Sequence, residues 1–466
     1  MDRRSFFDWS ARGLGTIAAM HLLERDGVLR AETHHPAKAK RAIQITLVGG
    51  LSHVDSFDRK PVLDSLHGTA LKTDTKPDLF FGQMGLLRRS DWKFRQRGQS
   101  GLWVSDLFPH IAGCADHLCV VNSMQADSAN HTPALFVQNS GFAFNGYPAL
   151  GSWLSRGLGS IADDLPAFVV LPDARGDANG AAANWTSGFL PAQHQGVVFR
   201  GGDSPVSDLF PAKPIDPGEE ADSRAFLSSL NSMHLARNGD EADLAARIRS
   251  YGLAAKMQLA VPEVADLSRE SAKTKAMYGM DAPVTRECGR NCLLARRLLE
   301  RGVRFVQIYS GGPIAGTPRS SWDAHENVLE NHGSEASKID RPVAGLLRDL
   351  AARGMLDDTL VIFTTEFGRT PFAQSAGNAV GPGRDHNKYA FSVWLAGAGV
   401  KAGTAYGATD DIGWKVARDP VTWPDFHATV LHLMGIDHER LTYYHNGIRR
   451  RLTNVHGRVV RGILAG

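Results

Sequence analysis

The chain contains 466 residues, of which 43% are hydrophobic, enough to bury a large core. Its formal net charge of +3 is small for this length, so the composition argues against a nucleic-acid partner or an anionic membrane surface. Chains of this size often hold two or more domains, but large α/β enzymes place as much sequence in one unit. The 18 histidines, many beside Asp, Asn or Gly, favour a metal or acid–base site.

Residues 1–40 have the character of an export signal and leader. The letters RRSFF at residues 3–7 resemble the twin-arginine motif, and residues 13–23 form a weakly apolar stretch after it. That stretch contains His21 and is much shorter than the roughly 20 apolar residues of a stable membrane span. We therefore expect export by the twin-arginine route to the periplasm or cell envelope. The alternative is an amphipathic N-terminal helix.

Five short apolar runs predict buried β-strands, at residues 42–48, 167–171, 305–309, 360–364 and 391–395. Runs with so few polar interruptions are typical of parallel strands covered on both faces. Helical patterns lie between them, at residues 292–301 and 339–353, and the second ends in the stop signal Arg353-Gly354. This alternation predicts an α/β fold with a central, mostly parallel, doubly wound sheet between helices. Sites in such sheets form beyond the carboxyl ends of the strands.

We assign residues 41–466 to one α/β domain with an insertion. Residues 201–224 are rich in Pro, Gly, Asp and Ser and predict an exposed loop. The helical segment after it, to about Met277, interrupts the alternation of strand and helix. The range of about 175–285 is therefore predicted to be the insertion.

Polar clusters follow the predicted strands or lie in loops marked by Gly and Pro. Five clusters contain Ser52, His53, Asp55 and Asp58; Asn130 and His131; Asp323, His325 and Asn327; Glu366 and Arg369; and Arg384, Asp385 and His386. Each has a structural explanation when taken alone, because Asp and Asn at strand ends often cap helices or close turns. Taken together, they can converge at one edge of a parallel sheet. Carboxylates mixed with imidazoles favour zinc, iron or manganese, or an acid–base site, whereas carboxylates alone favour calcium or magnesium.

Seven segments carry a resemblance to a known family. They are GGLSHVDSFD, NHTPALFVQNSG, YPALGSWLSRGLG, SWDAHENV, DDTLVIFTTEFGRTP, GRDHN, and AGAGVKAG with YGATDDIG after it, spread over nearly the whole chain. In order and content they resemble the bacterial family called domain of unknown function 1501, in the sulfatase-like branch of the alkaline phosphatase superfamily. The resemblance implies an alkaline phosphatase/sulfatase-like α/β fold in which divalent metals hold a phosphate or sulfate ester.

The resemblance also suggests metal ligands. Asp323, His325 and His386 resemble the superfamily's second metal position. Asp385 would be a further ligand, or the carboxylate that fixes the tautomer of the neighbouring imidazole. Glu366 stands where the superfamily pattern has an aspartate, and it could still bind a metal.

The end of the first strand departs from the superfamily pattern. Gly49-Gly50 replaces the paired aspartates that are typical there. This leaves Asp55, or His53, as the substitute ligand or substrate contact.

The nucleophile segment also departs from that of the sulfatases. NHTPALFVQNSG aligns with the sulfatase pattern Cys-Thr-Pro-Ser-Arg, so His131 takes the place of the formylglycine-forming cysteine and Leu135 that of the arginine. The ordinary sulfatase mechanism is therefore excluded. His131 remains a candidate nucleophile, acid–base group or metal ligand. Ser52 is a second candidate nucleophile, at a strand end where backbone N–H groups could support an anion, and a helix-capping turn is its alternative.

The remaining candidates concern substrate binding. Arg384 and Arg369 are predicted anion clamps, because guanidinium groups bind tetrahedral oxyanions in a bidentate way, or else they form salt bridges with nearby acids. Asn130 belongs to the His131 cluster. Trp185 lies in an aromatic, Gly-flanked segment of the insertion, which predicts either a substrate-binding loop or a hydrophobic anchor.

The leading hypothesis is a metal-dependent hydrolase of sulfate or phosphate esters in the cell envelope. It would use Zn, Mn, Ca or Mg and act on an anionic ester or a sulfated glycan. The second hypothesis is a non-catalytic protein that keeps the fold and binds an anionic glycan or a partner protein, which the missing Cys or Ser favours. A third is a metal-dependent transferase or isomerase of phosphorylated substrates.

Overall fold

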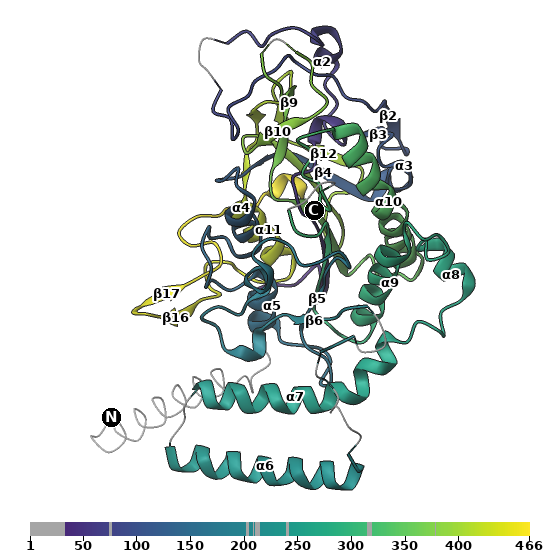
Figure 1. The fold of residues 1–466 in the computed structure, drawn as a ribbon. Coiled ribbons are helices and arrows are strands. Elements are labelled where there is room, and N and C mark those ends of the chain that lie inside the picture. The colour runs from purple at the N-terminus through teal and green to yellow at the C-terminus, as the bar shows by residue number, and fades with distance from the viewer. Residues whose placement is uncertain are drawn as a thin grey trace.

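The computed structural model describes residues 33–73, 77–201, 205–207, 209, 215–238, 242–314, 319–377 and 379–466. The predicted twin-arginine motif lies outside the described residues. Within them, a nine-stranded sheet runs through the centre of the molecule, with helices packed on both of its faces (Figure 1). This confirms the predicted α/β fold with a central, mostly parallel sheet between helices.

The central sheet has the strand order β12-β4-β11-β8-β1-β7-β5-β6, and β15 also pairs with β4. Neighbouring strands are parallel except at β11, which is antiparallel to both β4 and β8. The strands are β1 (Arg41–Leu47), β4 (Leu118–Gln125), β5 (Phe168–Leu171), β6 (Val197–Val198), β7 (Phe305–Ser310), β8 (Thr359–Thr365), β11 (Phe391–Gly397), β12 (Thr404–Tyr406) and β15 (Val421–Thr422). The five predicted apolar runs lie in β1, β5, β7, β8 and β11, whereas β4, β6, β12 and β15 were not predicted.

Two large cores hold seven of the described helices against the sheet. The helices are α2 (Pro61–Leu66), α3 (Pro109–Ala112), α4 (His131–Ser140), α5 (Leu150–Leu158), α6 (Pro217–Asn238), α7 (Ala242–Ala265), α8 (Ala272–Met277), α9 (Arg286–Glu300), α10 (Val328–Ala352) and α11 (Trp423–Leu433). One core joins α3, α7, α9 and α10 to one face of the sheet, and the other joins α4, α5 and α11 to the opposite face (Figure 1).

Strand β1 shows how the sequence sorts residues between the two faces. Ile43, Ile45 and Leu47 point into the α9–α10 core, as the two-residue period of a strand requires. Gln44 and Thr46 alternate with them and are buried on the other side. There they belong to a polar row that reaches helix α4, where the Gln138 amide donates to Thr364 Oγ1 at 2.9 Å. The polar row therefore fixes the register of α4, whose first residue is His131.

Helix α10 begins earlier than its apolar pattern predicts, at Val328 instead of Ile339. Its N-cap is Asn327, whose side chain accepts a hydrogen bond from the Glu330 amide. The helix ends at Ala352, and Gly354 follows in a left-handed conformation with φ +68°, as the predicted stop signal requires.

The predicted insertion contains the long helices α6 and α7, which lie side by side beyond the β5–β6 edge of the sheet (Figure 1). Helix α6 begins at Pro217, so the predicted loop at residues 201–224 is wrong for its last third. Proline in the first turn, followed by Glu219 and Glu220, favours a helix N-terminus. Strand β6 lies within the same range but pairs with β5, so this part belongs to the central sheet.

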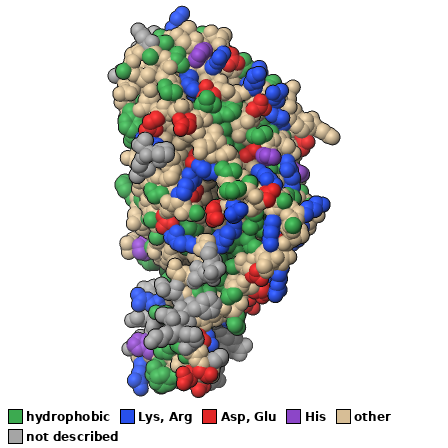
Figure 2. Space-filling model, turned by 45° about the vertical axis from the view of Figure 1, so that its right-hand side comes forward, with side chains coloured by type: hydrophobic (Ala, Val, Ile, Leu, Met, Phe, Trp, Pro, Cys, Tyr) green, Lys and Arg blue, Asp and Glu red, His purple; other side chains and the backbone are tan. Residues whose placement is uncertain are grey.

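Four two-stranded hairpins complete the described structure. They are β2 (Phe94–Arg97) with β3 (Leu102–Ser105), β9 (Gly368–Ala373) with β10 (Arg384–Asn387), β13 (Ala408–Thr409) with β14 (Val416–Arg418), and β16 (Tyr443–His445) with β17 (Ile448–Arg450). Positive and negative side chains are interspersed on the face shown in Figure 2, in keeping with the small net charge. No helix in the described ranges combines the length and apolarity that crossing a membrane requires.

Candidate metal centre

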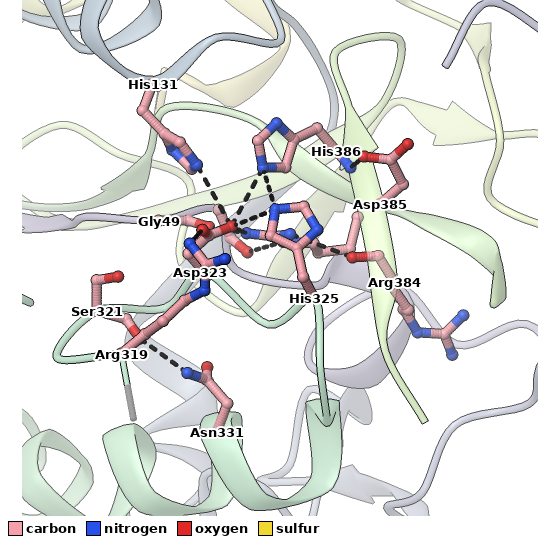
Figure 3. A network of polar contacts seen from close by, with 12 residues as sticks. Gly49, His131, Arg319, Ser321, Asp323, His325, Asn331, Arg384, Asp385 and His386 are labelled. Atoms are coloured by element: carbon pink, nitrogen blue, oxygen red, sulfur yellow. Dashed lines mark hydrogen bonds and ion pairs between the residues drawn. The ribbon is translucent and has the colours of Figure 1, made fainter. Parts of the chain in front are cut away.

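Four predicted residues from separate parts of the chain meet beyond the carboxyl ends of β1, β7 and β8 (Figure 3). His131 is the first residue of α4, and Asp323 and His325 lie in the connection from β7 to α10. His386 is on β10, which follows β8 by way of β9. One donor atom from each lies within 4.8 Å of the others, and all four side chains are buried. The convergence predicted from parallel-sheet topology is therefore observed for three of the five clusters, whereas Asp55, Glu366 and Asp385 are not among the converging donors.

Asp323 Oδ1 is the centre of the group. It lies 2.8 Å from His325 Nε2, 3.1 Å from His386 Nε2 and 3.3 Å from His131 Nε2. Burial would raise the pKa of this carboxyl, but the charge of Arg369 and the three imidazoles outweigh burial and hold the pKa well below its usual range. Asp323 is therefore a carboxylate with an oxygen directed at three imidazole nitrogens.

The opposite nitrogen of each ring fixes its tautomer. His386 Nδ1 donates to the Ala129 carbonyl at 2.6 Å, and His325 Nδ1 donates to the side-chain oxygen of Gln374. His131 Nδ1 donates to Glu366 Oε1 at 2.8 Å. Because these oxygens only accept hydrogen bonds, Nδ1 carries the proton and Nε2 presents a lone pair to the centre. Metal-binding histidines are oriented in this way by carboxylates and carbonyls.

Two observations favour a cation at this point. His325 Nε2 and His386 Nε2 lie 2.9 Å apart, where two lone pairs would repel unless a proton or a metal ion is shared between them. His131 Nε2 is buried and makes no hydrogen bond of good geometry, although Asp323 Oδ1 lies 3.3 Å away. A buried polar atom without a partner is costly, and a metal bond would satisfy it. The residues present therefore fit a metal ion.

The charge of each ring depends on its neighbours. Burial lowers the pKa of His131, but contacts with Asp323 and Glu366 outweigh burial and raise it above the ordinary value. Burial, followed by the positive charge of Arg369, lowers the pKa of His386 well below the ordinary value. His131 therefore binds a second proton more readily than His386 does.

Glu366 lies directly behind His131 and is not one of the four converging donors. Its Oε1 accepts from His131 Nδ1 and from the Gly49 amide, both at 2.8 Å. Gly49 has φ +121°, and a Cβ there would lie 2.4 Å from the Asp323 amide nitrogen. The glycine that replaces an expected aspartate thus lets strand β1 approach the backbone of the metal-binding loop.

Asp385 and Asp55 lie outside the group of four. Asp385 Oδ1 accepts from the His386 amide at 2.7 Å, and Oδ2 accepts from the Phe81 amide at 3.0 Å. Asp385 therefore holds a loop against the centre, while the Ala129 carbonyl fixes the tautomer of His386. Asp55 forms a fully buried ion pair with Arg384, whose Nε lies 2.8 Å from Asp55 Oδ2.

The predicted nucleophile Ser52 and the neighbouring His53 are buried in other contacts. Ser52 Oγ donates to Asp55 Oδ2 at 2.5 Å, and the Ser52 amide donates to His332 Nε2. His53 Nε2 donates to the Gly413 carbonyl at 2.8 Å. Both side chains therefore belong to the packing beneath the centre.

Arg369 also has a supporting position. Its guanidinium donates to Asp323 Oδ1 at 2.6 Å and to the carbonyls of Gly49, Gly50 and Arg384, and the side chain is fully buried. It therefore holds Asp323 in place and neutralises its charge.

The two remaining predicted residues lie in different surroundings. Asn130 is the N-cap of α4 and lines a pocket that reaches His386. Trp185 is buried in the core on the α4–α5 face, with its ring centroid 5.6 Å from that of Tyr309. Of the two roles predicted for the segment of Trp185, this placement fits the hydrophobic anchor and not the substrate-binding loop.

The structure adds contacts that no motif indicated. Phe80 and Phe81 lie over the centre, with ring centroids 4.7 Å from those of His386 and His325 respectively. Both phenylalanines are partly exposed, so they separate the centre from solvent. Arg319 contacts Asp323 Oδ2, the oxygen that faces away from the three histidines (Figure 3).

Replacing Glu366 by glutamine is expected to lower metal affinity by about 10–100-fold, because His131 loses the carboxylate that orients it and raises its basicity. The measurement is competition with a chromophoric chelator at neutral pH. Glu300→Gln is the matched control, since Glu300 pairs with Arg296 and Arg353 instead. Unchanged affinity in Glu366→Gln would contradict the assigned role of Glu366.

Several solved structures resemble the chain at low identity. The lipoteichoic acid synthase from Listeria monocytogenes is 10% identical, with a TM-score of 0.39 over 90% of this chain and 78% of that chain. A sulfatase from a Pseudoalteromonas species is 12% identical, with a TM-score of 0.36 over 86% and 68%. A phosphonate monoester hydrolase from Silicibacter pomeroyi is 12% identical, with a TM-score of 0.36 over 77% and 71%. Likeness at this level does not establish an activity for this chain.

No curated protein matches the chain. A family model described as "Protein of unknown function (DUF1501)" matches residues 39–464, which include the whole central sheet and all four converging donors. The chain therefore belongs to the DUF1501 family, as its motifs predicted.

Proposed function

We propose that the protein is a metal-dependent hydrolase of phosphate or sulfate esters. The observation that carries the proposal is the convergence of three imidazole Nε2 atoms and Asp323 Oδ1, with each Nδ1 bound to an oxygen acceptor. Buried donors arranged in this way are suited to hold a cation and costly to leave without one.

The donor set narrows the choice of metal. Three nitrogens and one oxygen suit zinc, manganese or iron, whereas calcium and magnesium prefer oxygen ligands. We therefore expect zinc or manganese to bind more tightly than calcium or magnesium. When bound, such an ion acts as a Lewis acid that polarises an oxygen of the ester.

The residues around the centre supply the other requirements of ester hydrolysis. Arg369 keeps Asp323 ionised, and Phe80 and Phe81 limit the access of bulk water. A pocket of about 330 Å³ reaches His386 and is lined by Phe80, Asn130, Lys388 and Tyr389, among others. This pocket takes the organic group of the ester, and water is the nucleophile.

The aromatic and polar lining of this pocket is compatible with a sugar ring, so an anionic glycan ester is the proposed class of substrate. The proposed location is the cell envelope, supported by the arginine pair at residues 3–4. Export can be tested by fractionating cells that express the native chain and a chain with both arginines replaced by lysine.

A binding protein without turnover is the second candidate. It is favoured by His131, which stands in place of the sulfatase cysteine and is one of the four converging donors. A protein of this kind would bind metal and an anionic ligand but hydrolyse no ester.

The deciding experiment combines elemental analysis of the purified protein with assays on aryl phosphates, aryl sulfates and phosphonate monoesters. Metal-free protein is assayed before and after addition of Zn, Mn, Ca or Mg. Turnover that depends on zinc or manganese is expected. Bound metal with no turnover would favour the binding protein, and absence of metal together with absence of turnover would refute the proposal.

A further inference from the structure

Three arginines lie near the metal-binding group, but two of them are buried and paired within the protein. Arg369 and Arg384 are both fully buried. Arg369 donates to Asp323 and to three backbone carbonyls. Arg384 donates to Asp55 and to the carbonyls of Thr370, Arg88 and Arg89. Neither guanidinium can take an anion from solvent without breaking the core.

Arg319 differs from both in exposure and in its partners. Its side chain is 25% exposed, and Nη1 contacts Asp323 Oδ2 at the edge of the metal-binding group (Figure 3). Its Nε and Nη2 atoms donate to the Glu326 carboxylate at 3.1–3.3 Å. The guanidinium is therefore held beside the metal-binding group by one partner and paired on its outer edge with another.

The outer partner is easily displaced. Glu326 is 60% exposed, and exposed ion pairs contribute little because water solvates both charges. The edge of Arg319 that Glu326 takes is the fork that binds two oxygens of a phosphate or sulfate. The Glu326 carboxylate therefore occupies the edge of Arg319 that a tetrahedral oxyanion would use.

We infer that Arg319 binds the anionic group of the substrate and that Glu326 takes its place when the site is empty. The inference rests on the proposed function and names the residue that recognises the phosphate or sulfate. The contact with Asp323 places the guanidinium, and with it the bound anion, at the outer edge of the metal-binding group, behind Asp323. Glu326 is then a competitor, and removing its charge strengthens anion binding.

The test uses the metal-loaded protein with inorganic phosphate and, separately, inorganic sulfate, by isothermal titration calorimetry. Arg319→Met is expected to weaken binding of the preferred anion by about tenfold or more, and Arg319→Lys by less, because it keeps the charge but loses the fork. Glu326→Gln is expected to tighten binding a few-fold. The two titrations separate a phosphate site from a sulfate site.

Arg301→Met is the matched control, because Arg301 is 34% exposed and lies between Asp164 and Glu263, where no metal ligand is near. Metal content is measured for every variant. No binding of either anion at millimolar concentrations, or unchanged binding in Arg319→Met with its metal retained, would overturn the inference. If Arg319→Met loses metal, the Glu326→Gln variant decides the question. An anion affinity of Glu326→Gln equal to or weaker than that of the native protein would overturn the inference.

These outcomes are separate from failure of the proposed function. Anion binding is measured without turnover, so a protein that hydrolyses no ester can still support Arg319 as the anion-binding residue. Conversely, the protein could hydrolyse esters while its anion affinity stays unchanged in the Arg319 and Glu326 variants. That result would contradict the inference about Arg319 but not the proposed function.

Discussion

Replacing His325 by alanine is expected to remove bound metal and ester hydrolysis together while the protein stays folded. His325 supplies one of four donors, and its Nε2 lies 2.8 Å from Asp323 Oδ1 and 2.9 Å from His386 Nε2. Loss of a direct ligand should weaken metal binding by more than the roughly 10–100-fold that loss of an outer partner costs. The measurements are metal content after dialysis, turnover with added zinc or manganese, and far-UV circular dichroism.

The matched control for this prediction is His456→Ala, because His456 is exposed and lies outside the four donors. It should keep metal content and turnover at the native level. Asp323→Asn is a second probe with nearly unchanged shape, and it should lose metal through loss of charge alone. Native metal content in both His325→Ala and Asp323→Asn would show that these residues do not form a metal centre.

The strands of the fold were predictable where both faces of the sheet are covered. Runs such as residues 305–309 and 360–364 are apolar except for Gln307 and Thr364 respectively, because helices pack on either side of β7 and β8. Strand β4 was not predicted because Asn122, Ser123 and Gln125 interrupt its apolar run. The first turns of α10 were missed for the same reason, since polar residues there give no apolar period.

The converging residues were predictable as a set of clusters at strand ends. Which of them are metal donors and which support the donors was not predictable. Topology alone places His131, Asp323, His325 and His386 at one sheet edge. Each carboxylate could face either the metal-binding group or an arginine. Packing between residues that are far apart in sequence decides which of the two it faces. Asp55 and Arg384, for example, are 329 positions apart. Arg319 and the Phe80–Phe81 pair belong to no motif, so only the structure could place them at the centre.

Replacing Arg384 by methionine is expected to lower the free energy of unfolding by roughly 3–5 kcal/mol, because it leaves the fully buried Asp55 carboxylate without its partner. Burial alone would raise the pKa of Asp55, but the charge of Arg384 outweighs burial and lowers the pKa to about 2. In the variant that pKa should rise, so Asp55 takes up a proton at a higher pH. The measurement is urea unfolding of both proteins at pH 7.5 and pH 5.

The sign of the pH effect tests the explanation. If the pKa of Asp55 is raised in the folded Arg384→Met variant, protonation of Asp55 stabilises the folded state. The decrease in the free energy of unfolding caused by Arg384→Met should therefore be smaller at pH 5 than at pH 7.5. The double variant Arg384→Met/Asp55→Asn should recover part of the loss, because no uncompensated charge remains. The prediction of Arg384 as a catalytic anion clamp is tested by the same proteins. If the folded variant keeps its metal and its affinity for phosphate, the role of this arginine is to hold Asp55 and the loop beneath the centre.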